Sequence, residues 1–247
     1  MKVVILAGGW PSSINEELEG IPKPMVELGG RPLLWHIMKQ YSYYGYNDFI
    51  ICAGYKSKMI KEYFMNYYVY ESDITVDLQT NQIEIHKKIS EDWTVSIVDT
   101  GLYTSVSERI LKIRDYIADD LFFINYGDCI SNINIKELEK CYRLEKKAMT
   151  VAVAKPTGRN SVLKLDKSES SQSWVNACTM LCEPEVFSYL DKNESYLENG
   201  LFERLNQKNE IALYKHEGFW TLVETKRDKN NLQQMWDDNE APWKIWS

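Results

Sequence analysis

Residues 3–9 read Val-Val-Ile-Leu-Ala-Gly-Gly, an unbroken apolar run that ends in two glycines. Five consecutive apolar residues without polar alternation predict a strand that is buried on both faces, as in a parallel sheet. Because glycine has no side chain, the backbone after this strand can approach a phosphate closely. The stretch therefore predicts a sheet whose first strand leads into a turn that can hold a ligand.

The turn continues with Trp-Pro-Ser-Ser at residues 10–13, an unusual composition for a phosphate-binding loop. Pro11 has no N–H to donate and cannot adopt a positive φ. The sequence contains no Lys or Arg between Lys2 and Lys23, so the loop offers no cation of its own. The turn is thus a nucleotide site, a modified one, or the remains of one.

Hydrophobic periodicity predicts an alternation of strands and helices along the chain. Apolar runs predict strands at residues 3–7, 49–54, 74–78, 82–87, 93–99, 121–126, 149–154, 175–182 and 211–214. Helical spacing predicts helices at residues 32–44, 57–68, 107–117, 133–147, 185–190, 201–206 and 228–237. This order is typical of parallel βαβ units, so we expect a doubly wound α/β domain with a mainly parallel sheet. It would span residues 1–220, and residues 221–247 would form a C-terminal helix and tail packing on it or on a neighbouring subunit.

Composition excludes several classes of partner. With 247 residues, of which 44% are apolar, the chain can bury one substantial core. A formal net charge of -7 argues against nucleic acid or an anionic membrane as the main partner. No apolar run approaches the length of a membrane span, and the five scattered cysteines form no zinc set. We therefore expect a soluble, cytoplasmic protein with reduced thiols.

Two candidate residues follow from local context. Asp128 lies just beyond the apolar run 121–126, where a carboxylate can hold a divalent cation or cap the next helix. Lys23 lies between Pro22 and Pro24, which restrict the backbone on both sides. The restricted backbone could aim the ammonium group of Lys23 into a site. The alternative is a stiff surface turn with a solvated lysine.

Arg109 is a third candidate, at the start of a predicted helix. A guanidinium group can grip a phosphate with two parallel hydrogen bonds. The alternative is an ordinary surface ion pair with Glu108 or Asp115. The sequence leaves both interpretations open.

Short motifs along nearly the whole chain occur in the order known from one enzyme family. They are VILAGG (4–9), PKPMVE (22–27), LWHIM (34–38), DFIIC (48–52), VDTG (98–101), YGD (126–128), GFW (218–220) and APWK (241–244). With these motifs the chain resembles the sugar nucleotidyltransferase family, most closely the glucose-1-phosphate cytidylyltransferases. The ending APWK is the mark of the cytidylyl branch.

The resemblance implies that a sugar 1-phosphate attacks the α-phosphorus of CTP in line, giving a CDP-sugar and pyrophosphate, with Mg²⁺ bound. By position it implies catalytic roles for Lys23, Arg109 and Asp128. It implies nucleotide contacts by Leu6, Ala7, Gly8, Gly9, Trp10, Thr104, Arg109 and Gly127. It further implies acceptor binding by Asn176, magnesium binding by Asp128 and Glu224, and a homo-oligomeric assembly.

The chain also departs from the family pattern at several points. Ser13 stands where the family has an arginine, Glu224 where it has an aspartate, and Ser107-Glu108 where it has two glycines. The Glu-Lys-Pro segment that grips the sugar phosphate in the family is missing before Trp174. Three hypotheses therefore stay open: a working cytidylyltransferase, one with a different phosphorylated acceptor, and a non-catalytic relative that binds nucleotide or serves as an assembly subunit.

Overall fold

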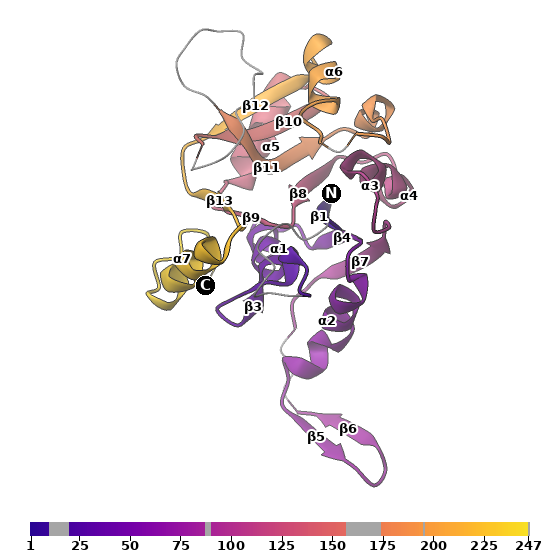
Figure 1. Ribbon diagram of the computed structural model, residues 1–247, viewed down its shortest axis with the longest axis vertical. Helices are drawn as coiled ribbons and strands as arrows, with labels where there is room; N and C mark the ends of the chain where they lie inside the picture. The colour runs from indigo at the N-terminus through magenta and orange to yellow at the C-terminus, as the bar shows by residue number, and fades with distance from the viewer. Residues whose placement is uncertain (10–19, 87–89, 157–173, 195, 247) are drawn as a thin grey trace.

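The computed structural model is built around a seven-stranded sheet (Figure 1) and describes residues 1–9, 20–86, 90–156, 174–194 and 196–246. In spatial order the strands are β12 (Ile211–His216), β10 (Met149–Ala154), β11 (Val175–Cys182), β8 (Phe122–Tyr126), β1 (Lys2–Ala7), β4 (Asp48–Ala53) and β7 (Thr94–Asp99). Strand β11 runs antiparallel to both of its neighbours, and the other pairs are parallel. The predicted α/β fold with a mainly parallel sheet is confirmed.

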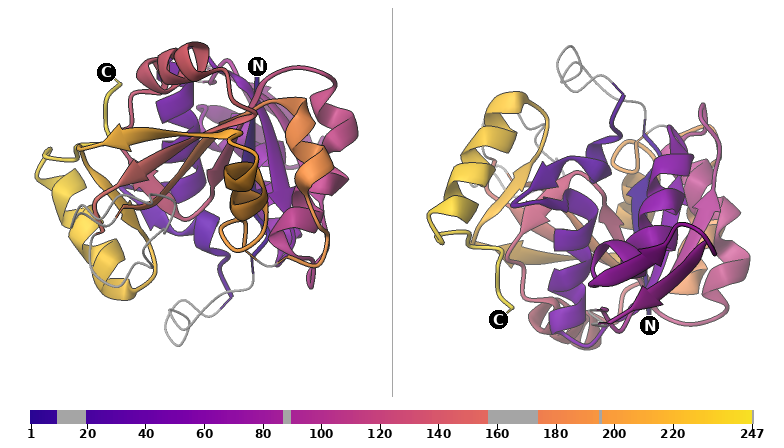
Figure 2. Two further views of the ribbon diagram at one scale, coloured as in Figure 1. Left: turned by 90° about the horizontal axis from the view of Figure 1, so that it is seen from above. Right: turned by 90° about the horizontal axis from the view of Figure 1, so that it is seen from below.

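Helices cover both faces of this sheet (Figure 2). On one face lie α1 (Leu33–Tyr43), α2 (Ser57–Tyr70) and α5 (Ile135–Glu145). On the other lie α3 (Val106–Lys112), α4 (Arg114–Ile117), the 3-10 helix η3 (Pro184–Tyr189) and α6 (Leu201–Gln207). Val3 and Ile5 belong to the first apolar cluster, whereas Val4 and Leu6 belong to the second. Burial on both faces is why β1 is apolar without alternation.

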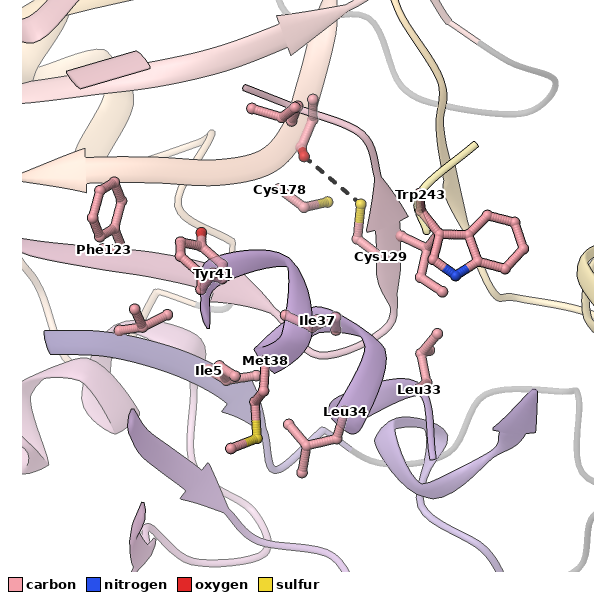
Figure 3. Close-up of a cluster of buried hydrophobic side chains, with 14 of the residues drawn as sticks. Ile5, Leu33, Leu34, Ile37, Met38, Tyr41, Phe123, Cys129, Cys178 and Trp243 are labelled. Carbon is pink, nitrogen blue, oxygen red and sulfur yellow. Dashed lines mark hydrogen bonds between the residues drawn. The ribbon is translucent and has the colours of Figure 1, made fainter. Parts of the chain in front are cut away.

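Figure 3 shows the first of these clusters, in which α1 packs on the sheet. Ile37, Met38 and Tyr41 of α1 are fully or almost fully buried and lie over Ile5 and Phe123. Apolar residues recur along α1 with a spacing near one helical turn, so they share one face. This packing fixes the position of β1, the strand that leads into Gly8 and Gly9.

Several short elements escape the sequence-based prediction. They are β2 (Glu27–Leu28) paired with β3 (Arg31–Pro32), β9 (Cys129–Ser131) paired with β13 (Trp220–Leu222), and the 3-10 helix η2 (Lys23–Met25). Segments of two or three residues are too short to show a period. The helix predicted over residues 107–117 is also interrupted at Ile113, between α3 and α4. The segment predicted as a helix over 185–190 is a 3-10 helix.

Strands β5 (Ile74–Asp77) and β6 (Gln82–Ile85) form a hairpin that projects from the body of the molecule (Figure 1). Ile74 pairs with Ile85 and Val76 with Ile83, so four branched apolar side chains share one face. Ile74, Val76 and Ile83 are each more than one third exposed. The fold thus carries an amphipathic hairpin outside its core.

The C-terminal segment packs on α1 and β2 through α7 (Lys226–Asp237) and the residues after it. Trp243 is 1% exposed, and its Nε1–H points to Nδ1 of His36 at 3.4 Å. Nε2 of His36 lies 2.8 Å from the carbonyl oxygen of Leu28, which makes it the protonated nitrogen. Burial lowers the pKa of His36 to about 4. The boundary at residue 220 stays a prediction.

The five cysteines are free thiols, and all but Cys141 are buried. Burial raises the pKa of Cys52 to about 12, so this thiol stays protonated at neutral pH. None of the helices in the described part of the chain is long and apolar enough to cross a membrane.

Candidate functional site

A cavity of about 740 Å³ opens beyond the carboxyl ends of β1 and β8. Ligands of open parallel sheets bind at this edge, where the strand order reverses. The sequence-predicted residues that line the cavity are Leu6, Ala7, Gly8, Gly9, Lys23, Thr104, Arg109 and Asp128. Eight predicted residues from four separate segments of the chain therefore meet at one site.

Lys23 and Asp128 form an ion pair inside this cavity. The Nζ atom of Lys23 lies 3.0 Å from Oδ2 of Asp128, and the two side chains are 18% and 26% exposed. Pro24, within the 3-10 turn η2, is buried and lies against Gly127. The turn holding Lys23 is therefore anchored to the segment holding Asp128, and the alternative of a solvated surface lysine is wrong.

Arg109 is 4% exposed, and its guanidinium group is bound to the protein itself. It donates to Oγ1 of Thr100 and to the carbonyl oxygen of Gly101, both at 2.7 Å, and to that of Leu102 at 3.3 Å. Glu108 pairs with Lys112 instead, at 2.9 Å. The alternative of a surface ion pair is therefore wrong, and the donors that a phosphate would use are largely occupied by backbone acceptors.

Three glycines surround this guanidinium at the ends of three neighbouring strands. Gly8 follows β1, Gly54 follows β4 and Gly101 follows β7. A Cβ added at Gly8 would lie 2.2 Å from Nη1 of Arg109, and one added at Gly54 would lie 2.6 Å from it. Any side chain at these positions would displace the arginine. We call Gly8, Gly54, Gly101 and Arg109 the cavity floor.

Burial sets the electrostatics of this part of the site. It lowers the pKa of Arg109, and the nearby Cys52, Glu108 and Asp99 act in the opposite direction. The guanidinium keeps its proton nevertheless, because its ordinary pKa is far above neutral. Burial also raises the pKa of the Tyr126 hydroxyl at the cavity wall, which therefore stays neutral. The floor thus carries one fixed positive charge.

Gly127, Asn176 and Glu224 are not among the described residues that line the cavity. The N–H of Gly127 donates to the carbonyl oxygen of Leu6 at 3.0 Å, which joins β8 to β1. Asn176 donates to Glu198 at 2.8 Å and accepts from the N–H of Cys178. Glu224 is exposed at the start of the C-terminal segment. Trp10 and the rest of the loop 10–19 lie outside the described residues, as do residues 157–173.

The neighbourhood of Asp128 bears on metal binding. The N–H of Val223 donates to the carbonyl oxygen of Asp128 at 2.8 Å, which brings the chain before Glu224 to the same end of the sheet. No group of three metal-binding side chains occurs among the described residues. Mg²⁺ needs no such group, because it is held by one or two carboxylates together with substrate phosphates and water. The donor set at Asp128 therefore fits a magnesium ion that arrives with a nucleotide.

Sequence analysis missed Lys192 and Asn193, which also line the cavity. They belong to a turn after η3, and Oγ of Ser105 donates to the carbonyl oxygen of Lys192 at 2.5 Å across 87 residues of sequence. The local sequence Asp-Lys-Asn-Glu indicates a polar turn and nothing more. Folding alone brings this turn to the site.

The sequence is similar to those of known nucleotidyltransferases. The model of the nucleotidyl transferase family matches residues 2–162 of the chain. The glucose-1-phosphate cytidylyltransferases of Salmonella typhimurium (strain LT2) and Salmonella typhi are each 38% identical to the chain over 256 residues, covering all of this chain and all of each relative. The sequence resemblance thus extends over the full length.

Solved structures support the same fold. A UDP-glucose pyrophosphorylase complexed with UDP-glucose superposes with a TM-score of 0.71 at 15% identity, covering 96% of this chain and 98% of that chain. At such low identity the likeness concerns the fold alone. It supports the predicted doubly wound α/β fold with a mainly parallel sheet.

Proposed function

Because the chain belongs to the nucleotidyl transferase family, we propose that it is a cytidylyltransferase that joins CTP and a sugar 1-phosphate into a CDP-sugar and pyrophosphate. The observation that carries this proposal is the identity of 38% over the full length of the Salmonella glucose-1-phosphate cytidylyltransferases. Glucose 1-phosphate is accordingly the first acceptor to test.

In this reaction a phosphate oxygen of the sugar 1-phosphate bonds to the α-phosphorus of CTP. The bond from that phosphorus to the bridging oxygen breaks, and pyrophosphate leaves. Catalysis of this kind depends on positioning and on charge neutralisation rather than on covalent chemistry. Lys23 supplies a cation in the cavity, and the exposed backbone at Gly9 can approach the triphosphate. Thr104 lines the same cavity and would contact the nucleotide.

Arg109 acts differently in this proposal. Its guanidinium is bound to Thr100, Gly101 and Leu102, so it holds the loop after β7 and packs against Gly8 and Gly54 rather than gripping a phosphate with two parallel hydrogen bonds. A bound Mg²⁺, held by Asp128 with Glu224 as a second candidate ligand, would supply positive charge to the phosphates. Lys23 then has to share Asp128 with the metal ion.

A specific observation favours one alternative acceptor. Asn176, the residue expected to bind the sugar, is engaged by Glu198 and by the backbone of Cys178 and does not line the described cavity wall. An acceptor other than glucose 1-phosphate would explain this arrangement. The candidate is a cytidylyltransferase for a different phosphorylated small molecule.

The decisive test measures pyrophosphate release from CTP, UTP, GTP and dTTP with glucose 1-phosphate and with a panel of other sugar phosphates. We expect release with CTP, dependence on Mg²⁺, and loss of the signal in Asp128→Asn. Release with another sugar phosphate in place of glucose 1-phosphate would select the alternative acceptor. No release with any pair, together with no stabilisation by CTP in thermal unfolding, would overturn both and favour a non-catalytic relative.

The family resemblance also implies a homo-oligomer, and this too is a proposal. Light scattering of the purified protein at micromolar concentration checks it directly. A mass of one chain, 28.9 kDa, would contradict it.

A further inference from the structure

Cytidylyl transfer brings a triphosphate and a sugar phosphate into one cavity, so their charges require several cations. The sequence offers none in the loop after β1, because no Lys or Arg occurs between Lys2 and Lys23. Lys23 is neutralised by Asp128 at 3.0 Å, and the donors of Arg109 are bound to backbone and hydroxyl oxygens. Apart from Mg²⁺, which would compete with Lys23 for Asp128, a cation without a protein partner would add positive charge for the phosphates of both substrates.

Lys192 meets this requirement. It lines the cavity together with Asn193, it is exposed, and no residue in the described part of the chain forms an ion pair or hydrogen bond with its ammonium group. Of the three cationic side chains that line the described wall, Lys23 and Arg109 already have partners. Lys192 is thus the one whose charge is available to a ligand without breaking a contact among the described residues.

The backbone around Lys192 is fixed against α3. Oγ of Ser105 donates to the carbonyl oxygen of Lys192 at 2.5 Å, and the N–H of Ser107 donates to the carbonyl oxygen of Glu194 at 3.4 Å. The carboxylate of Glu194 is in turn held by Arg204, whose Nη2 lies 2.8 Å from Oε2. The turn therefore presents Lys192 to the cavity from a defined position, although the lysine side chain itself is free to adapt.

We propose that Lys192 is a phosphate-binding residue of this site, which takes over charge neutralisation that the loop after β1 does not provide. The proposal rests on the proposed cytidylyltransferase function. A lysine ammonium binds phosphate as a point charge with rotatable donors, so it can follow either the triphosphate or the phosphate of the acceptor. Both ligands offer the same chemistry, and the kinetics of a charge-removing variant distinguish them.

The experiment compares wild type with Lys192→Gln, Lys192→Arg and the control Lys140→Gln. Lys140 has the same charge, is 67% exposed on α5 and makes only a 3.4 Å ion pair with Glu137. We expect Lys192→Gln to raise the KM of one substrate about tenfold, as loss of a charged hydrogen bond does, with a smaller change in kcat. The substrate whose KM rises, CTP or the sugar phosphate, identifies the phosphate that Lys192 binds. Lys192→Arg should recover most of the affinity, and Lys140→Gln should behave as wild type.

Unchanged KM values for both substrates in Lys192→Gln would overturn the proposal while leaving the proposed function intact. If the wild type releases no pyrophosphate, the proposed function fails and calorimetric titration with inorganic pyrophosphate becomes the readout. Weaker pyrophosphate binding by Lys192→Gln than by Lys140→Gln would still support a phosphate site at Lys192. Equal binding by the two variants, or none by the wild type, would overturn it.

Discussion

The cavity floor and the Lys23–Asp128 pair both place a basic group at the same cavity, but the two groups differ in burial and in the number of their protein partners. Arg109 of the floor is 4% exposed and donates to three acceptors of the protein, whereas the Lys23 side chain is 18% exposed and has one carboxylate partner. Removing the buried arginine leaves the Thr100 hydroxyl and the carbonyl groups of Gly101 and Leu102 without these donors, whereas a partly exposed ion pair can open at little cost. The floor should therefore govern folding stability, and the pair should govern activity.

The largest effect is expected from Asp128→Asn. Losing the carboxylate removes the candidate metal ligand, and loss of one charge-stabilising group at a reacting centre costs about 10³-fold in rate, equivalent to about 4 kcal/mol. Pyrophosphate release with CTP measures the loss of rate. The free energy of unfolding, followed by thermal unfolding, should stay within about 1 kcal/mol of wild type. A loss of stability without a loss of rate would show that Asp128, like Arg109, has a structural role.

Arg109→Met should destabilise the fold by about 3 kcal/mol, because it keeps the apolar stem and removes the donors to the buried Thr100 hydroxyl and to the carbonyl groups of Gly101 and Leu102. Urea unfolding measures this difference. Arg114→Met, on the exposed surface of α4, is the matched control and should change stability by less than about 0.5 kcal/mol. Equal midpoints for the two variants would contradict the structural role of the floor.

His36 extends the comparison to a buried base, since it is 1% exposed and is held by Leu28 and Trp243. Its folded pKa of about 4 lies below the ordinary value of 6.5, so between these values only the unfolded chain takes up the proton. Stability should fall as the pH decreases from 6.5 to 4, by at most about 3 kcal/mol. Urea midpoints across this range should fall less steeply in His36→Gln than in His86→Gln, and the slope that remains comes in part from His216, whose pKa burial also lowers. The same slope in both variants would exclude His36 as its source.

Gly8→Ala tests the close approach at the floor. The new methyl group would meet Nη1 of Arg109, so we expect a loss of about 2 kcal/mol. Because both changes disrupt one contact, the double variant with Arg109→Met should cost less than the sum of the single variants. Full additivity in urea unfolding would show that Gly8 and Arg109 act independently.

The smallest effect on stability is expected from Lys23→Gln, at less than about 1 kcal/mol, because its ion pair is partly exposed. Activity should fall far more, by about 10²-fold, since the ammonium lies in the cavity that receives the phosphates. Thermal unfolding and pyrophosphate release on one preparation separate the two effects. A stability loss as large as that of Arg109→Met would show that the Lys23–Asp128 pair contributes as much to folding stability as the cavity floor does.

Local sequence patterns predict much of this fold. The continuous apolar runs of β1, β4 and β8 indicate strands buried on both faces, and their carboxyl ends predict one shared edge for Gly8 and Asp128. Lys23, singled out by its two flanking prolines and by the family resemblance, lines the same cavity. Local patterns do not predict β9 and β13, which are three residues each and pair with one another across the chain.

Sequence alone indicated the α/β class, the family and eight residues of the cavity wall, because buried strands, their end turns and short motifs carry local signals. Where Arg109 and Lys192 lie, and what they contact, depends on the tertiary structure. Arg109 meets Gly8 and Gly54 because three strand ends converge, and Lys192 reaches the site through a contact with Ser105 across 87 residues. Such partners are selected by the folded sheet, and charge and periodicity along the chain do not encode them.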